Sequence, residues 1–183
     1  MAELKEQNLV WIDLEMTGLC PEKDYILEIA SLVTDSQLNI IAQGPSLIIH
    51  QPDSALQVMN EWVLKQHTKT GLVDAVRKST ITLKQAEQET LNFLGNYCKP
   101  SSSPLCGNSV WQDRAFIRTA MPELNNFLHY RIIDVTSIKE VVKRWYPHDR
   151  RIEFKKQDSH RALDDIKESV AELVYYRENF FIK

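Results

Sequence analysis

The stretch Asn8-Leu9-Val10-Trp11-Ile12-Asp13-Leu14-Glu15 places two acids at the end of an apolar run. A short apolar run is typical of a buried strand. Side chains alternate across a strand, so Asp13 and Glu15 project from one face with their Cα atoms about 7 Å apart. Two carboxylates on one buried face repel, and one of them keeps a proton unless a positive charge lies between them. The stretch therefore predicts a divalent-cation site.

The donor atoms narrow the choice of metal. Carboxylate oxygens suit Mg²⁺ or Mn²⁺, and no Cys or His lies close enough in sequence to favour zinc. The three cysteines, Cys20, Cys98 and Cys106, are odd in number and form no Cys-x-x-Cys pair. We therefore expect small reduced residues and neither a disulfide framework nor a zinc site.

The composition predicts a globular protein. The chain has 183 residues, of which 43% are apolar and 26% charged, so we expect a single domain over residues 1–183. No run approaches the roughly 18 apolar residues of a membrane span, and residues 1–7 lack the features of a signal peptide, which predicts a cytoplasmic protein without a membrane partner. The net charge of −3 argues against a protein that coats long nucleic acid, but it allows a partner with few phosphates.

Strand-like segments come first along the chain. Residues 8–15, 25–34 and 38–49 are rich in Val, Ile and Leu and are separated by turn residues, which indicates an antiparallel meander of three strands. Helical segments and short strands then alternate. Helices are expected at residues 61–69, from the capping box Thr82-x-x-Gln85 onward, and at residues 110–120, 137–146 and 161–178. Short strands are expected between them at residues 105–107 and 131–135. This order predicts an α/β fold with a mixed sheet, the meander plus short parallel strands, flanked by helices.

The last predicted helix is amphipathic. Its apolar residues at helical spacing should pack inward, and they are Ala162, Ile166, Val170, Leu173 and Val174. Lys167, Glu168 and Glu172 are expected to face water.

Three separated motifs carry a family resemblance. They are Asp13-Leu14-Glu15-Met16-Thr17-Gly18-Leu19, then Cys106-Gly107-Asn108-Ser109 with Gln112-Asp113-Arg114, and finally His160 with Asp165 five residues later. In this order they resemble the three exonuclease motifs of the DEDDh 3′→5′ exonucleases, and most closely the branch that degrades very short RNA. The resemblance extends from residue 8 to about residue 180 and implies a ribonuclease H-like fold.

The resemblance also implies a mechanism. The acids Asp13, Glu15, Asp113 and Asp165 would hold two divalent ions, Mg²⁺ or Mn²⁺, with Asp13 bridging both. His160 would be the general base, because an imidazole with a pKa near 6.5 accepts a proton at neutral pH. The product would be a nucleoside 5′-monophosphate.

Each of these residues also has an ordinary interpretation. Acids such as Asp13 and Glu15 are common at strand ends, Asp113 would stabilise a helix dipole near its start, and His160 could cap the final helix. Only their joint occurrence favours catalysis.

The second of two adjacent acids is chosen as the ligand. Asp164 and Asp165 point to different sides of a helix. Asp165 lies nearer the small residues Ala162 and Ser169 and has the required spacing from His160, whereas Asp164 is expected to bond His160 or meet solvent.

The family resemblance implies that apolar side chains hold the bases, and the matching residues are Leu19 and Trp62. Stacking on an aromatic ring tolerates any base, so low base specificity is expected. A core position for Trp62 is the alternative, because the neighbouring Val63 and Leu64 are also apolar.

A phosphate cap would explain short substrates of two to five nucleotides. In the family, the 5′ phosphate of a dinucleotide contacts polar groups that match Ser109, Gln112 and His67, while Tyr130 and Arg131 reach over from the second subunit of a homodimer. The arginine fork bonds two phosphate oxygens at once. The alternative is that these are ordinary polar surface residues.

Two other functions remain open. One is a DEDDh nuclease that acts on DNA ends or structured RNA. The other is a catalytically silent nucleic-acid-binding module, which should have lost one of the five catalytic residues, although all five are present.

Overall fold

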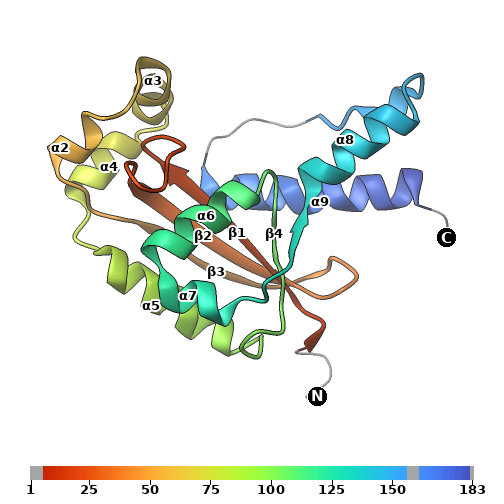
Figure 1. The fold of residues 1–183 in the computed structure, drawn as a ribbon, viewed down its shortest axis with the longest axis horizontal. Coiled ribbons are helices and arrows are strands. Elements are labelled where there is room, and N and C mark those ends of the chain that lie inside the picture. Colours follow the sequence, from red (N-terminus) through yellow and green to blue (C-terminus); the bar gives the residue numbers. More distant parts are fainter. Residues whose placement is uncertain (1–5, 156–160, 182–183) are drawn as a thin grey trace.

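The computed structural model describes residues 6–155 and 161–181, and its centre is a five-stranded sheet (Figure 1). The strand order is β3-β2-β1-β4-β5. The strands are β1 (Leu9–Met16), β2 (Ile26–Thr34), β3 (Ile40–Ile48), β4 (Leu105–Gly107) and β5 (Ile132–Asp134). Strands β1, β2 and β3 pair antiparallel, whereas β4 pairs parallel with β1 and β5 parallel with β4. The predicted mixed sheet is therefore confirmed, and each strand lies within two residues of its predicted bounds.

Helices pack on both sides of the sheet. They are α2 (Asp53–Leu56), α3 (Glu61–Lys69), α4 (Leu72–Lys78), α5 (Leu83–Gly95), α6 (Trp111–Ala120), α7 (Pro122–Phe127), α8 (Val135–Trp145) and α9 (Ala162–Phe180), with a short 3₁₀ helix at Arg150–Ile152. The capping box at Thr82 is present at the start of α5. The short helices α2, α4 and α7 were not predicted. Gly71 follows the end of α3 and begins α4, where its φ of 76° favours glycine.

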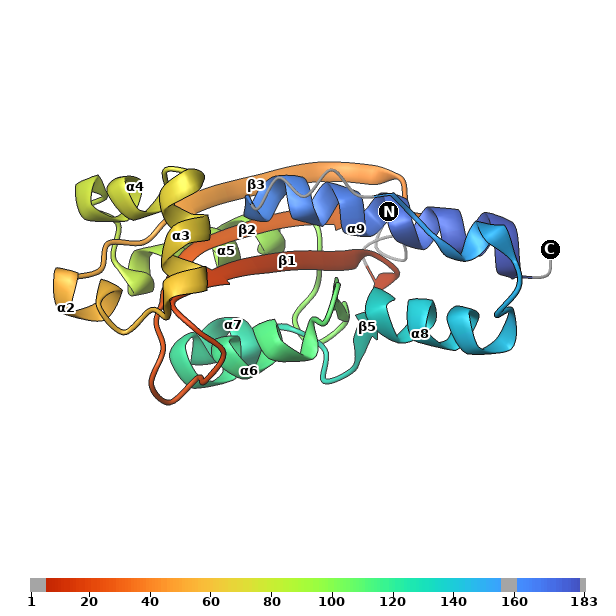
Figure 2. The same ribbon diagram turned by 90° about the horizontal axis from the view of Figure 1, so that it is seen from above.

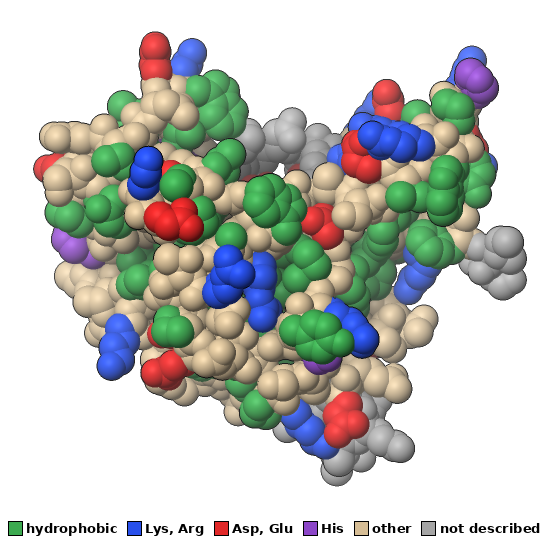
Figure 3. Space-filling model, viewed as in Figure 1, with side chains coloured by type: hydrophobic (Ala, Val, Ile, Leu, Met, Phe, Trp, Pro, Cys, Tyr) green, Lys and Arg blue, Asp and Glu red, His purple; other side chains and the backbone are tan. Residues whose placement is uncertain are grey.

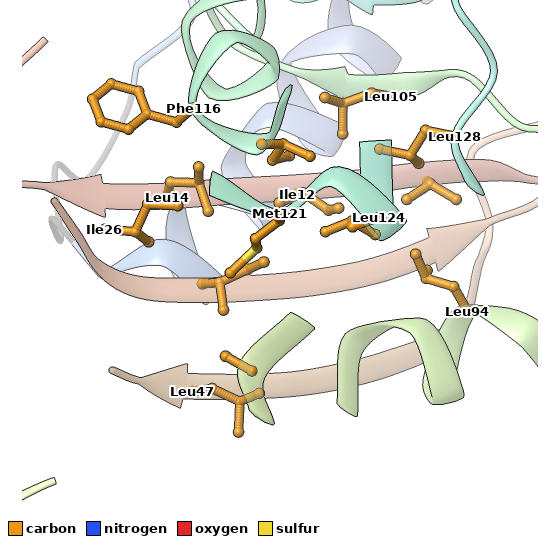
Figure 4. Close-up of a cluster of buried hydrophobic side chains, with 14 of the residues drawn as sticks. Ile12, Leu14, Ile26, Leu47, Leu94, Leu105, Phe116, Met121, Leu124 and Leu128 are labelled. Atoms are coloured by element: carbon orange, nitrogen blue, oxygen red, sulfur yellow. The ribbon is translucent and has the colours of Figure 1, made fainter. Parts of the chain in front are cut away.

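The alternation of β1 separates two apolar clusters. Ile12 and Leu14 face α5, α6 and α7, where they pack with Leu105 and Phe116 (Figure 4). The opposite face carries Trp11, which packs with residues of α9. Figure 2 shows α9 lying along the sheet. Asp13 and Glu15 are in phase with Trp11, so they lie on the α9 side of the sheet. The strand thus directs its two acids toward the final helix.

The predicted inward stripe of α9 is confirmed, but the prediction for Glu172 is wrong. Its side chain is 0% exposed and accepts hydrogen bonds from Lys139 at 2.9 Å and from Asn108 at 3.1 Å. The Tyr176 hydroxyl donates to it as well. Burial of a carboxylate is tolerated when such partners replace water. Among the described residues, no helix is long and apolar enough to cross a membrane.

Candidate active site

Three carboxylates meet between β1 and the first turn of α9. Asp13, Glu15 and Asp165 each offer an oxygen, and these oxygens all lie within 4.8 Å of one another. Two of the acids come from alternate positions of one strand and the third from a helix packed on that face. The neighbouring Asp164 is exposed, so the geometry favours Asp165 of the two. Asp13, Glu15 and Asp165 form what we call the acidic cluster.

Asp113 reaches the same region from the first turn of α6. It is 6% exposed, and its Oδ1 accepts a hydrogen bond of 3.0 Å from the backbone N–H of Leu14. Its charge is the largest single-residue contribution to the raised pKa of Asp13. Asp113 therefore lies beside the acidic cluster with one oxygen engaged by β1.

The electrostatics of the acidic cluster are unfavourable for anions. Burial, followed by repulsion from Asp113, Glu15 and Asp165, raises the pKa of Asp13 well above its ordinary value. Burial, followed by the charges of Asp165, Glu28 and Asp113, raises the pKa of Glu15 to about 8. Burial also raises the pKa of Asp113, although the hydrogen bond from Leu14 opposes this. A hard divalent cation among these oxygens would relieve the repulsion, so the donor set fits Mg²⁺ or Mn²⁺.

A pocket of about 490 Å³ opens beside Glu15. Leu19 and Trp62 line it, and their side chains are 74% and 65% exposed. Trp62 therefore does not belong to the core, which excludes the alternative for that residue. Two large apolar side chains exposed next to half-buried acids offer a flat surface against which a base could stack.

Two of the predicted phosphate ligands hold the loop that carries Leu19. Gln112 Nε2 donates to the carbonyl of Leu19 at 2.6 Å. His67 is buried, with Nε2 at 2.9 Å from the carbonyl of Met16 and Nδ1 at 3.8 Å from Glu15 Oε2. Both side chains thus brace the pocket in this structure, and whether they contact a phosphate stays a prediction.

Asp24 also fixes this loop, and the motif search missed it. Its carboxylate accepts hydrogen bonds of 2.9 Å from Thr17 Oγ1 and from the backbone N–H of Cys20. A Cβ at Gly18 would lie 2.4 Å from Asp24 Oδ2. The glycine inside the first motif is therefore needed for this close approach.

The remaining cap candidates lie away from the pocket within one chain. Ser109 is exposed, has a φ of 50°, and donates its N–H to Asp134 Oδ1 at 3.0 Å and to Thr136 Oγ1 at 2.9 Å. Tyr130 is 73% exposed, and the Arg131 guanidinium lies 5.0 Å from its ring centre. Tyr130 does not line the pocket of Leu19 and Trp62. His160 lies outside the described residues, so its position is not part of this geometry.

The fold and the acidic cluster define a nuclease of the exonuclease class. A family model described as exonuclease matches residues 10–173. A crystal structure of Escherichia coli exonuclease I with single-stranded DNA superimposes with a TM-score of 0.71 at 15% identity, over 95% of this chain and 41% of that one. The chain thus spans about two fifths of that protein, and the likeness shows the shared fold.

Two curated relatives are far more similar. An oligoribonuclease of Yersinia enterocolitica is 54% identical over 183 residues, which is 100% of both chains. The mitochondrial oligoribonuclease of Homo sapiens is 54% identical over 181 residues, covering 99% of this chain and 76% of that protein. The chain belongs to the oligoribonuclease family, within the exonucleases, and is a hydrolase that acts on nucleic acid.

Proposed function

We propose that the protein is a 3′→5′ exoribonuclease that degrades very short RNA, favours dinucleotides and releases nucleoside 5′-monophosphates. The acidic cluster beside the exposed Leu19 and Trp62 is the observation that carries this proposal. Its place beside a pocket suits hydrolysis of the phosphodiester next to a held base. The oligoribonuclease names of the relatives support RNA as the substrate. The cytoplasmic location stays a prediction, since the human relative is named as mitochondrial.

Divalent ions complete the proposed site. Asp13, Glu15, Asp113 and Asp165 would hold two ions, Mg²⁺ or Mn²⁺, because hard cations prefer carboxylate oxygens. When bound, such ions make water more acidic and neutralise charge on the phosphate and on the leaving oxygen. His160 would accept the proton of the attacking water. It precedes α9 by two residues, and α9 supplies Asp165 to the acidic cluster.

Replacement of Trp62 by Ala is expected to raise KM for a dinucleotide about tenfold with little change in kcat, because stacking contributes roughly 1 to 3 kcal/mol per base. Steady-state kinetics on a diribonucleotide measure this. Trp62→Phe retains an aromatic face and should stay within about threefold of the wild type. A Trp62→Ala enzyme with unchanged KM contradicts base stacking at this position.

The proposed cap requires a second copy of the chain. Ser109, Gln112 and His67 would contact the 5′ phosphate from one subunit, with Tyr130 and Arg131 supplied by the other. The exposure of Tyr130 outside the pocket of its own chain supports this arrangement.

A second surface is suited to the subunit contact. Tyr130 borders a hollow of about 530 Å³ with Trp111, Arg114 and Arg118 on α6. Figure 3 shows basic and apolar side chains together on this face of the molecule. Exposed aromatic and arginine side chains are enriched in protein interfaces.

The test compares end-labelled RNAs of two to ten nucleotides in Mg²⁺. The wild-type protein should cleave dinucleotides far faster than RNAs of ten nucleotides. Arg131→Ala should slow cleavage of dinucleotides by roughly tenfold to a hundredfold, because a hydrogen bond to a charged group contributes about 1.5 to 3 kcal/mol. Cleavage of RNAs of ten nucleotides should change much less. Arg150→Ala removes an equal charge from an exposed site and serves as the control.

Light scattering on the same protein samples distinguishes a variant that has lost the protein dimer from one that has lost only the contact with the 5′ phosphate. A dimeric Arg131→Ala protein with the altered length preference supports the cap. If the wild-type protein cleaves dinucleotides and RNAs of ten nucleotides equally fast, the phosphate cap is contradicted and a nuclease for longer substrates is favoured. A monomeric wild type contradicts the shared site.

A further inference from the structure

An additional acid lies beside the acidic cluster but is not available as a ligand. Glu28 is 1% exposed on β2, where it is directly paired with Glu15 of β1 in the antiparallel register. Paired residues share a face, so its side chain lies on the α9 side of the sheet. Its oxygens accept hydrogen bonds from Ser46 Oγ at 3.0 Å and from the guanidinium of Arg161. Glu28 is therefore a structural acid next to the metal ligands.

Arg161 makes a two-point contact with this carboxylate. Its Nε donates to Glu28 Oε2 at 3.2 Å and a terminal nitrogen donates to Oε1 at 3.1 Å. This fork geometry fixes direction as well as distance, which a single bond from lysine does not.

The same arginine begins the helix that carries Asp165. Arg161 is the N-cap residue of α9, and its carbonyl accepts hydrogen bonds from the N–H groups of Asp164 at 2.9 Å and Asp165 at 3.0 Å. N-cap positions favour Ser, Thr, Asp and Asn, whose side chains cap the helix, whereas Arg161 makes no side-chain cap. Its side chain reaches to β2 instead. One residue thus joins the turn of Asp165 to the strand paired with Glu15.

We propose that Glu28 and Arg161 form a positioning pair that holds Asp165 at metal-binding distance from Asp13 and Glu15. The inference rests on the proposed metal-dependent function. The rest of α9 is anchored by its apolar stripe, including Ile166 and Val170. Loss of the pair should therefore displace the first turn and spare the fold.

The substitution Arg161→Gln distinguishes an effect of charge from an effect of the position of Asp165, because the two predict opposite changes in the affinity for a cation. Arg161→Gln leaves the negative charge of Glu28 uncompensated near the cluster. If only charge mattered, a cation would bind more tightly, because attraction between opposite charges increases. If position matters, the cation binds more weakly because one ligand has moved. The double variant Glu28→Gln/Arg161→Gln keeps the net charge of the wild type and leaves no unpaired buried charge.

Isothermal titration calorimetry with Mn²⁺ on the full chain without RNA measures the difference. We expect Arg161→Gln and the double variant to raise the Kd for Mn²⁺ at least tenfold, and Arg161→Lys to give a smaller rise. Arg177→Gln, on the same helix but bonded to the carbonyl of Gln37, is the matched control and should not change the Kd. Circular dichroism of each variant tests whether it is folded.

Unchanged or tighter Mn²⁺ binding by folded Arg161→Gln overturns the inference, as does wild-type affinity in the double variant. If Arg161→Gln does not fold, the Mn²⁺ affinity of the double variant alone tests the inference. A wild type that binds no Mn²⁺ overturns the proposed metal-dependent function itself, which separates the two failures. At saturating Mn²⁺, the variants should show a lower kcat with the wild-type KM for a dinucleotide, because the pocket of Trp62 is unaltered.

Discussion

Replacement of Asp13 by Asn is expected to lower kcat for RNA cleavage by at least about 10³-fold and to stabilise the metal-free protein. A metal ion contributes several kcal/mol to the transition state, and each 1.36 kcal/mol is about tenfold in rate. In the proposed site Asp13 is the ligand expected to bridge both ions, and its oxygen lies within 4.8 Å of oxygens of Glu15 and Asp165. An amide keeps the shape but is a much weaker ligand.

The gain in stability follows from the same carboxylate. Without metal, burial and the surrounding acids raise the pKa of Asp13 well above its ordinary value, so the folded protein loses stability as the pH rises. Asn removes that repulsion, and we expect a gain on the order of 1 to 3 kcal/mol in the free energy of unfolding at pH 8.

Urea denaturation with a chelator present and rate measurements with Mn²⁺ test both halves of this prediction. Asp164→Asn changes an exposed acid on the same turn as Asp165 and should alter neither quantity appreciably. Residual activity above a tenth of the wild type, or a metal-free protein that becomes less stable, would contradict the role of Asp13.

Divalent ions are expected to stabilise the protein strongly at pH 8 and weakly at pH 5. The pKa of Glu15 is raised from an ordinary 4.5 to about 8. Between these values the folded state binds more protons than the unfolded state, so the metal-free protein loses stability as the pH rises through this window. Metal ions require the deprotonated carboxylates, and their affinity therefore rises over the same range.

The magnitude depends on how far the ion exceeds its Kd. At a free concentration of 100 times the Kd, binding stabilises the folded state by about 2.7 kcal/mol. Urea denaturation at pH 5 and pH 8, with Mn²⁺ or with a chelator, gives the four required free energies. The metal-dependent difference should nearly vanish in Asp13→Asn. Equal stabilisation at both pH values would show that the raised pKa values do not control metal binding.

The sequence pattern predicted the five strands and the long helices well but missed the short helices. The apolar run of residues 8–15 and the stripe of α9 each repeat often enough to identify a strand and a helix. Helices α2, α4 and α7 have four to seven residues, and so short a segment shows little helical period. Glu172 was misplaced because a charged residue is usually exposed. Its partners Lys139 and Asn108 come from distant segments, which only the folded chain brings together.

The acidic residues of the site that could be predicted from the sequence are those of the three motifs. The two-residue spacing of Asp13 and Glu15 places them on one face of a strand, and the third motif selected Asp165. The neighbourhoods of Glu28 and Arg161 share in the family resemblance, but nothing in the motifs indicates that these residues, 133 positions apart, form a pair. One signal was available, because Glu28 is the one charged residue in β2, where every residue is buried. A charge inside such a strand indicates a specific partner.

The central place of β1 has a consequence for turnover. The strand is paired with β2 along its length and with β4 near its start, and the N–H of Leu14 is engaged by Asp113. At Asp13 and Glu15 the strand is held by β2 on one side and by the Leu14–Asp113 bond on the other, so the acids are firmly positioned. In the proposed function, bases of different size would therefore be accommodated by movement of α3 and of residues 17–24, which carry Trp62 and Leu19.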